Sequence, residues 1–240
     1  MEPTPRQPFP ISPDTANPVA DCGICPRLAA HRAMLRIREP GWFNAPVPSF
    51  GDPGAWLAIV GLAPGEKGAN RTGRPFTGDF AGVLLYRTLI DLGLATGHYG
   101  ETPGDGLTLN GVIITNAVRC LPPANRPEPA EIRACRPFLE AQLAALPKLK
   151  VVLALGQIAH QSAVKALGGK LPRHRFAHAA VHRMHRGHVL VDSYHCSRYN
   201  QNTGRLTASM FREAFEAAIA ARSGADFRSP RTQISCASRP

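Results

Sequence analysis

The chain has 240 residues, of which 44% are hydrophobic, and a formal net charge of +11 from 28 Lys and Arg against 17 Asp and Glu. This size suits one globular domain, and no apolar stretch is long enough to span a membrane. Because the N-terminus also lacks the apolar segment of a signal peptide, we expect a cytoplasmic protein. The excess of arginine favours a polyanionic partner, although a basic tail would give the same composition.

Alternating apolar and amphipathic segments follow one another along the chain. Residues 1–20 are rich in proline and predict a flexible arm, after which a C-x-x-C loop leads into a helix that stops before Pro40. Continuously apolar runs predict strands within residues 55–64, 111–120, 149–156 and 188–195. Helices are predicted over residues 80–94, 128–146, 157–167 and 204–222, with Pro137 kinking or splitting the second. Residues 223–240, rich in Ser, Arg and Pro, predict a disordered tail.

Strands that are apolar throughout and alternate with helices predict an α/β domain, residues 21–222, with a parallel sheet covered on both faces. Ligands of such sheets bind at the carboxyl ends of the strands. Here the strands end in the Gly61 loop, Asn116, Gly156 and His195. Small, polar and ionisable residues are therefore expected to meet at one rim, as an active site requires.

The Gly-rich loop over residues 61–79 does not fit the usual nucleotide motifs. A P-loop needs G-x-x-x-x-G-K-[ST], whereas Gly65 is followed by Glu66 and Lys67, and G-x-G-x-x-G is also absent. The loop still offers backbone N–H groups to an anionic ligand. It therefore points to a nucleic acid more than to a free nucleoside triphosphate.

Six cysteines in an intracellular chain are a poor match to a disulfide framework. Four of them, Cys22, Cys25, Cys120 and Cys135, have spacings that suit a metal or cluster site. The wide second spacing favours a 4Fe-4S cluster over zinc, although zinc or unligated cysteines would be consistent with the same residues. Cys196 and Cys236 are expected to be free thiols.

Three segments together resemble the uracil-DNA glycosylase superfamily, most closely its iron–sulfur family 5: "GLAPGEKGANRTGRPFTGD", "TNAVRC" with "EIRAC", and "HCSRYNQNTGRLT". The resemblance runs from Cys22 to the last helix. It implies a three-layer α/β/α sandwich around a short, mainly parallel four-stranded sheet, and a 4Fe-4S cluster on the four cysteines. Leu62 stands where the related family 4 carries Glu, which favours family 5, while Glu66 is reminiscent of family 4.

The resemblance implies catalytic roles for Asp79, Asn116 and His195. His195 can donate a hydrogen bond to the departing base, and Asn116 can bind a base edge. The carboxylate of Asp79 can orient water or stabilise the sugar cation, and it is also well placed to cap the helix after it. The ordinary structural alternatives are a buried histidine at 195 and a buried-turn asparagine at 116.

Further residues are expected to bind the flipped nucleotide. Phe76 would stack on the base, unless it is a core aromatic. The remaining substrate-binding candidates are Gly61, Leu62, Ala63, Pro64, Ser197, Arg198 and Asn200. Arg198 and Tyr199 occupy the place of the loop that superfamily members insert into the duplex, and phosphate contacts are expected from Lys67, Arg71, Arg74, Arg198 and Arg205.

Two local features differ from the rest of the pattern. The family's H-P-S becomes His195-Cys196-Ser197, and we expect the turn without proline to be freer. The histidine-rich segment 174–188 has no place in the chemistry and is interpreted as a basic surface, with adventitious metal binding as the alternative.

Together these features predict a monofunctional DNA glycosylase that hydrolyses uracil, and also hypoxanthine and ethenocytosine, from DNA in base excision repair. Its partner would be single- or double-stranded DNA with deaminated bases, and the protein would act as a monomer at the nucleoid. The alternatives are a uracil-restricted family 4 enzyme and a non-catalytic iron–sulfur protein that binds DNA or senses redox state.

Overall fold

A six-stranded sheet runs through the centre of the molecule in the computed structural model, which describes residues 16–224. Its order is β1-β5-β2-β6-β8-β7. The four inner strands, β5 (Val112–Asn116), β2 (Leu57–Gly61), β6 (Val151–Leu155) and β8 (Val189–Ser193), are parallel. The short edge strands β1 (Phe50–Gly51) and β7 (Val181–Arg183) pair antiparallel with their neighbours.

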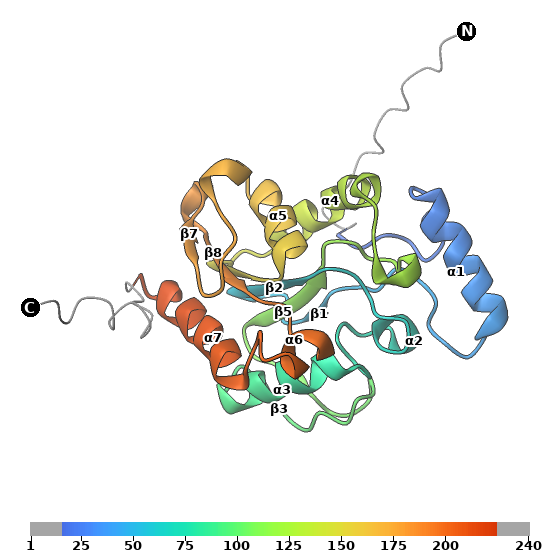
Figure 1. Cartoon of the computed structure of the whole chain (residues 1–240), viewed down its shortest axis with the longest axis horizontal. Helices are drawn as coiled ribbons and strands as arrows, with labels where there is room; N and C mark the ends of the chain where they lie inside the picture. Colours follow the sequence, from blue (N-terminus) through green and yellow to red (C-terminus); the bar gives the residue numbers. More distant parts are fainter. Residues whose placement is uncertain (1–15, 225–240) are drawn as a thin grey trace, which may run out of the picture.

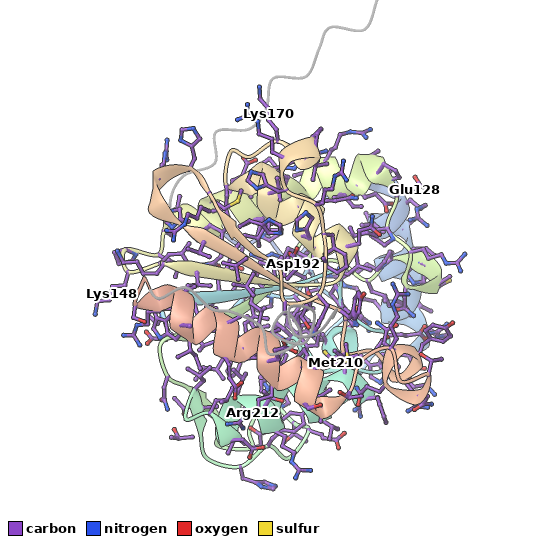
Figure 2. The ribbon with its side chains drawn as sticks, turned by 60° about the vertical axis from the view of Figure 1, so that its left-hand side comes forward. Glu128, Lys148, Lys170, Asp192, Met210 and Arg212 are labelled. Atoms are coloured by element: carbon purple, nitrogen blue, oxygen red, sulfur yellow. The ribbon has the colours of Figure 1, made fainter. Side chains whose placement is uncertain are left out.

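Helices cover both faces of this sheet (Figure 1). The helices α3 (Phe80–Asp91) and α7 (Ala208–Arg222) pack on one face, and α4 (Pro129–Ala144) and α5 (Gln157–Ala166) pack on the other. Figure 2 shows α7 alongside the sheet, with Asp192 in the interior and Lys148 and Lys170 at the periphery. This is the three-layer α/β/α arrangement predicted from the sequence.

The remaining elements lie in the connections between these layers. They are α1 (Pro26–Arg38), α2 (Ala69–Thr72), β3 (Ala95–Thr96), β4 (Thr108–Leu109), α6 (Arg198–Asn202) and the 3-10 turns η2 (Pro123–Asn125), η3 (Leu171–Arg173) and η4 (His185–Gly187). The strands β3 and β4 form a separate two-stranded sheet.

Alternation along the buried strands divides the core between the two helical layers. In β2, Leu57 and Ile59 belong to the cluster with α3 and α7, whereas Ala58 and Val60 belong to the cluster with α4 and α5. All five residues of the strand are buried, which is why the sequence shows an unbroken apolar run and no alternation.

The structure corrects two details of the predicted elements. The sheet has two short edge strands beyond the predicted four; two or three residues are too few to give a sequence pattern. Helix α4 continues through Pro137 without a split, because the buried side chains of Phe138 and Leu139 hold the helix against the core. Most of the predicted arm (1–20) and tail (223–240) lie outside the described residues.

A buried ion pair fixes the loop between α2 and α3. The guanidinium of Arg74 is 2.6 Å from Asp105 and 5.0 Å from the centre of the Phe50 ring. Tyr86 donates a 2.6 Å hydrogen bond to the carbonyl of Pro75 in the same loop. Arg74 is 4% exposed, so it is a structural residue. This corrects the phosphate contact that the sequence predicted for it.

We expect Asp105→Asn to destabilise the protein by about 3–5 kcal/mol, because it leaves the buried guanidinium without its counter-charge. The hydrogen bonds from Arg74 hold the pKa of the Asp105 carboxyl below its usual range. The difference in unfolding free energy between the wild-type protein and Asp105→Asn should therefore be largest above about pH 4 and should decrease as the pH falls below this value. Urea unfolding of both proteins between pH 2 and 7 measures this difference. A difference in unfolding free energy that is the same at all pH values would contradict the prediction.

Candidate active site

The carboxyl ends of the parallel strands bring the predicted catalytic segments together. Gly61, the last residue of β2, lies opposite Asn116, the last residue of β5, in the parallel ladder. The end of β8 continues through Tyr194 into His195, beside Gly156 at the end of β6. The convergence expected from the strand ends is therefore present in the structure.

Asp79, Asn116 and His195 all line one cavity of about 270 Å³ at this rim. Its volume corresponds to roughly nine water molecules, which is room for one nucleobase. The other lining residues are mostly apolar or small: Leu62, Ala63, Pro64, Gly65, Ala69, Phe76, Ala81, Asn125 and Ser197. The three polar groups that could carry chemistry thus face a largely apolar chamber.

The side chain of Asn116 is prepared for a ligand. It is 3% exposed, and its Oδ1 is buried without a hydrogen-bond partner among the described residues. A Cβ on Gly61 would lie 2.3 Å from this oxygen and 2.7 Å from Cζ of Phe76, so only glycine fits here. A buried unpaired amide at a cavity wall is costly unless a bound molecule completes it.

Asp79 caps α3 and also lines the cavity. Its Oδ1 accepts a 2.9 Å hydrogen bond from the Gly82 N–H and so caps α3. Its Oδ2 lies beside Gly65 and Gly68, where added Cβ atoms would be 3.4 Å and 2.5 Å away. Burial raises the pKa of this carboxyl, although backbone hydrogen bonds oppose the shift. The cap fixes one oxygen, and the carboxylate still lines the cavity.

His195 is held in place from behind. The side chain of Asn200 donates a 2.8 Å hydrogen bond to its carbonyl, and Gln201 donates at 2.7 Å to the carbonyl of Cys196. Cys196 is fully buried, and Ser197 caps α6. The turn is therefore tied down without proline, which differs from the freer turn expected. Burial lowers the pKa of His195 to about 4, so its imidazole is neutral at pH 7.

Phe76 forms a wall of the cavity next to His195, with the two ring centres 6.1 Å apart. It is 7% exposed and has a φ of 53°, which is unfavourable for a bulky residue. Its carbonyl accepts a 3.0 Å hydrogen bond from Tyr99, which helps to hold this conformation. The ring belongs to the hydrophobic core and also faces the cavity, where backbone strain of this kind is often functional.

The other predicted substrate residues divide into two groups. Leu62, Ala63, Pro64 and Ser197 line the cavity, whereas Gly61 lies beneath it and Asn200 supports His195 from outside the lining. Arg198 lies on the exposed side of α6, with its guanidinium 5.0 Å from the Phe80 ring centre. Lys67, Arg71, Arg198 and Arg205 are exposed and remain candidates for phosphate contacts.

Sequence reasoning missed Asn125, which lines the same cavity. It belongs to η2 and has a left-handed backbone, with a φ of 55°. Its position shortly after the second apolar strand is the only signal that could have suggested it.

The histidine-rich segment is not simply a basic surface. His182 lies in β7 and contacts the buried Asp192, and His178 accepts a hydrogen bond from the backbone N–H of Tyr194. His185 is exposed, as expected. The contacts made by the inward-facing histidines depend on strand pairing and could not be read from composition.

The four predicted metal-binding cysteines also come together. Cys22 and Cys25 precede α1, Cys120 follows β5, and Cys135 lies in α4; all four line one small pocket with Leu28, Val118 and Phe138. Burial and neighbouring thiolates raise the pKa of Cys25 to about 11 and that of Cys120 to about 12. Thiols with such raised pKa values lose their protons and become thiolates only when a cationic centre binds them.

Two arginines add positive charge to this pocket. Arg32 donates to Sγ of Cys120 at 3.5 Å and to the carbonyl of Cys22 at 2.8 Å. Arg119 is fully buried, its Nε has no partner, and it forms no ion pair with a carboxylate within residues 16–224. A buried guanidinium without a carboxylate needs another source of negative charge.

Comparison with known proteins shows similarity over most of the chain. A sequence model of the uracil DNA glycosylase superfamily matches residues 48–219. The type-5 uracil-DNA glycosylase of Thermus thermophilus is 47% identical over 198 residues, covering 80% of this chain and 90% of that protein. The type-5 enzyme of Pyrobaculum aerophilum is 38% identical and covers 86% and 92%.

The type-4 uracil-DNA glycosylase of Sulfurisphaera tokodaii is 41% identical over only 109 residues, covering 45% of this chain and 43% of that protein. None of the helices in residues 16–224 is long and apolar enough to cross a membrane. The two type-5 matches thus cover four fifths or more of this chain, whereas the type-4 match covers less than half of it. This chain belongs to the uracil DNA glycosylase superfamily and, within it, to the type-5 uracil-DNA glycosylases.

Proposed function

We propose that the protein is a monofunctional uracil-DNA glycosylase of base excision repair that also excises hypoxanthine and ethenocytosine. Membership of the type-5 family makes it a hydrolase of N-glycosyl bonds with uracil in DNA as substrate. The observation that carries the mechanism is the meeting of Asp79, Asn116 and His195 in one base-sized cavity. A protein that only binds DNA or senses redox state has no need of this arrangement.

The reaction requires a nucleotide that has left the duplex, because the cavity lies within the protein at the ends of the strands. The base would lie against Phe76, and the unpaired amide oxygen of Asn116 would accept from an N–H on its edge. The exposed cations at the loops would hold the flanking phosphates. All of these groups come from one chain, so we propose that a monomer acts on its DNA at the nucleoid.

Bond cleavage places negative charge on the leaving base and positive charge on the sugar. His195 would donate a hydrogen bond to the base as charge develops; a neutral imidazole can do so without taking part in proton transfer. Asp79 would stabilise the sugar cation or orient the attacking water with the oxygen that does not cap α3.

The composition of the cavity supports a substrate range wider than uracil. Leu62, Ala63 and Pro64 form apolar contacts, and few polar groups are available to select one base edge. An apolar pocket discriminates weakly between ligands that fit it, whereas dense hydrogen bonding rejects analogues strongly. Oligonucleotides with uracil, hypoxanthine or ethenocytosine test this; excision of uracil alone would favour a uracil-restricted enzyme.

We expect His195→Ala and Asp79→Asn to slow single-turnover excision of uracil by about 10²-fold or more, because each removes charge stabilisation in the transition state. Affinity for the same oligonucleotide should change by only a few-fold. Asparagine also caps helices well, so Asp79→Asn should leave α3 intact.

Matched controls exist on the surface. Asp91→Asn makes the same chemical change at the other end of α3, and His98→Ala does so at an exposed histidine; both should retain wild-type rates. Wild-type excision by His195→Ala or Asp79→Asn would remove that residue from the mechanism.

We further propose that Cys22, Cys25, Cys120 and Cys135 hold a 4Fe-4S cluster. The four cysteines line one pocket, and the wide Cys120–Cys135 spacing favours a cluster over the closely matched C-x-x-C pairs of zinc ribbons. The buried arginines Arg32 and Arg119 suit the negative charge of a thiolate-bound cluster. When bound, the group would fasten α1 to α4 and to the segment after β5.

Protein purified without oxygen should contain about four iron and four sulfide per chain. Cys135→Ser should lose most of this iron, whereas Cys196→Ser, at a buried cysteine outside the pocket, should retain it. Metal analysis, sulfide assay and thermal unfolding measure this. A protein loaded with zinc and free of iron would contradict the proposal.

A further inference from the structure

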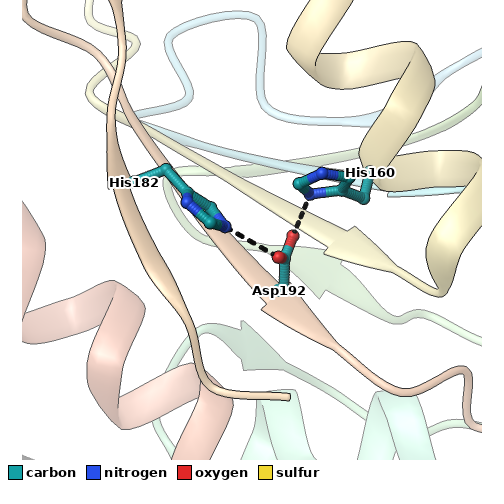
Figure 3. Close-up of side chains that lie close together, drawn as sticks. All are labelled: His160, His182 and Asp192. Carbon is teal, nitrogen blue, oxygen red and sulfur yellow. Dashed lines mark hydrogen bonds and ion pairs between the residues drawn. The ribbon is translucent and has the colours of Figure 1, made fainter. Parts of the chain in front are cut away.

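A second group of metal-binding side chains lies within the protein, away from both the cavity and the cysteines. His160 of α5, His182 of β7 and Asp192 of β8 point toward one another (Figure 3). Nδ1 of His160 is 2.7 Å from Oδ1 of Asp192, and Nε2 of His182 is 2.9 Å from Oδ2. It is the only group of three or more His, Cys, Asp or Glu in residues 16–224 whose ligand atoms all lie within 4.8 Å.

The fold gives this triad its geometry. His182 pairs with Leu190 across the antiparallel ladder, and Asp192 is two residues further along on the same face of the sheet. This face packs against α5, which presents His160. Asp192 and His160 are 0% and 1% exposed, and the His182 side chain is 12% exposed. Three elements thus meet at one buried carboxylate.

The second ring nitrogen of His160 is oriented as in many metal sites. Its Nε2 lies 2.9 Å from the carbonyl of His174, which can only accept a hydrogen bond. A histidine that binds a metal through one nitrogen commonly donates the other N–H to a carbonyl or carboxylate, which fixes the tautomer. Nδ1 is therefore the nitrogen left to face Asp192 and His182.

Without an ion, the same contacts require an extra proton. Both partners of His160, the carboxylate of Asp192 and the carbonyl of His174, are acceptors, so both ring nitrogens must carry hydrogen. Burial lowers the pKa of His160, but the hydrogen bond and charge of Asp192 outweigh this and leave the pKa raised. The position between the ligands is thus occupied by a proton that a metal ion can replace.

A cavity that is open to solvent borders the triad on the side of His160. An open cavity of about 360 Å³ is lined by His160 and His174, together with polar side chains of α5. The ring of His174 also packs edge-on against that of His182, with 5.6 Å between the ring centres. An ion could enter here, and water or His174 could complete its coordination.

We propose that His160, His182 and Asp192 form a binding site for a divalent transition metal ion, with Zn²⁺ as the principal ligand. Two imidazoles and one carboxylate are a frequent zinc ligand set, and the three ligand atoms already lie within 4.8 Å of one another. The ion bridges α5 and the β7–β8 hairpin. Because Asp192 lies three residues before His195 on the same chain segment, the ion stabilises the strand that delivers the catalytic histidine.

Binding of the metal ion at this site exchanges one zinc ion for one proton. Zn²⁺ takes the place of the Nδ1 proton of His160, and that proton leaves to buffer. His182 binds the ion through Nε2 and carries its single proton on Nδ1. No electron is transferred, and the net charge of the site rises by one. The apparent affinity should therefore fall as the pH is lowered, because protons compete with the ion for the imidazoles.

The test uses the iron-loaded protein, so that the cysteines are occupied. ZnCl₂ is titrated by calorimetry in two buffers of different ionisation enthalpy, and the bound zinc is examined by X-ray absorption. We expect about one zinc per chain, release of about one proton, and a ligand shell of nitrogen and oxygen at about 2.0–2.1 Å without sulfur at about 2.3 Å. His182→Asn should weaken binding by at least tenfold, whereas His185→Asn, at an exposed histidine of the same segment, should not.

Several outcomes would overturn the proposal. The first is that the wild-type protein binds no more zinc than His182→Asn does. The second is a zinc ligand shell that contains sulfur. The third is an affinity of His182→Asn for zinc equal to that of the wild-type protein. The absorption measurement on the wild-type protein decides the matter even if His182→Asn folds poorly. Uracil excision should be unchanged at 25 °C by added zinc, while the thermal unfolding temperature of the wild-type protein should rise.

Discussion

The active site depends on the absence of a side chain at position 61. The parallel pairing of β2 with β5 places Gly61 directly opposite Asn116, and a Cβ at this point would lie only 2.3 Å from the Asn116 amide. The missing side chain lets the amide stay buried and unpaired at the cavity wall, with the Phe76 ring beside it. A close strand pair that ends in glycine and asparagine thus produces both the space for a base and the group that can recognise it.

The surrounding structure maintains the unfavourable conformations that this space requires. Phe76 has a left-handed backbone, and tyrosine hydroxyls hold its carbonyl and that of Pro75. The ion pair of Arg74 with Asp105 lies just behind this loop. On the opposite side, Asn200 holds the carbonyl of His195 in a turn that continues through Cys196 without a proline. Rigid support on both sides keeps the catalytic groups in place before the substrate arrives.

Three of the groups of buried charge differ in how the charge is balanced. The pair of Arg74 with Asp105 is complete in itself and is structural. Arg119 has no carboxylate partner within residues 16–224 and lies beside the cysteines, which supports the proposal of an anionic cluster there. The triad of His160, His182 and Asp192 is balanced by a proton that a metal ion can replace. The molecule therefore has two proposed metal sites, the cysteine pocket and the His160 triad, in addition to the candidate active-site cavity.

The sequence alone determined the parts of this protein that depend on local pattern and on motif. Unbroken apolar runs identified the four parallel strands, and Asn116 and His195 were predicted from their places at the ends of two of them. Asp79 was predicted from the family resemblance of the loop after the first strand, and the four cysteines from their spacing. The tertiary structure alone decided which charges are buried, because a residue such as Arg74 looks the same in a sequence whether it faces DNA or an aspartate. It also decided the roles of Asn125, Asn200 and the His160 triad, since these contacts join segments whose separation in sequence carries no period or motif.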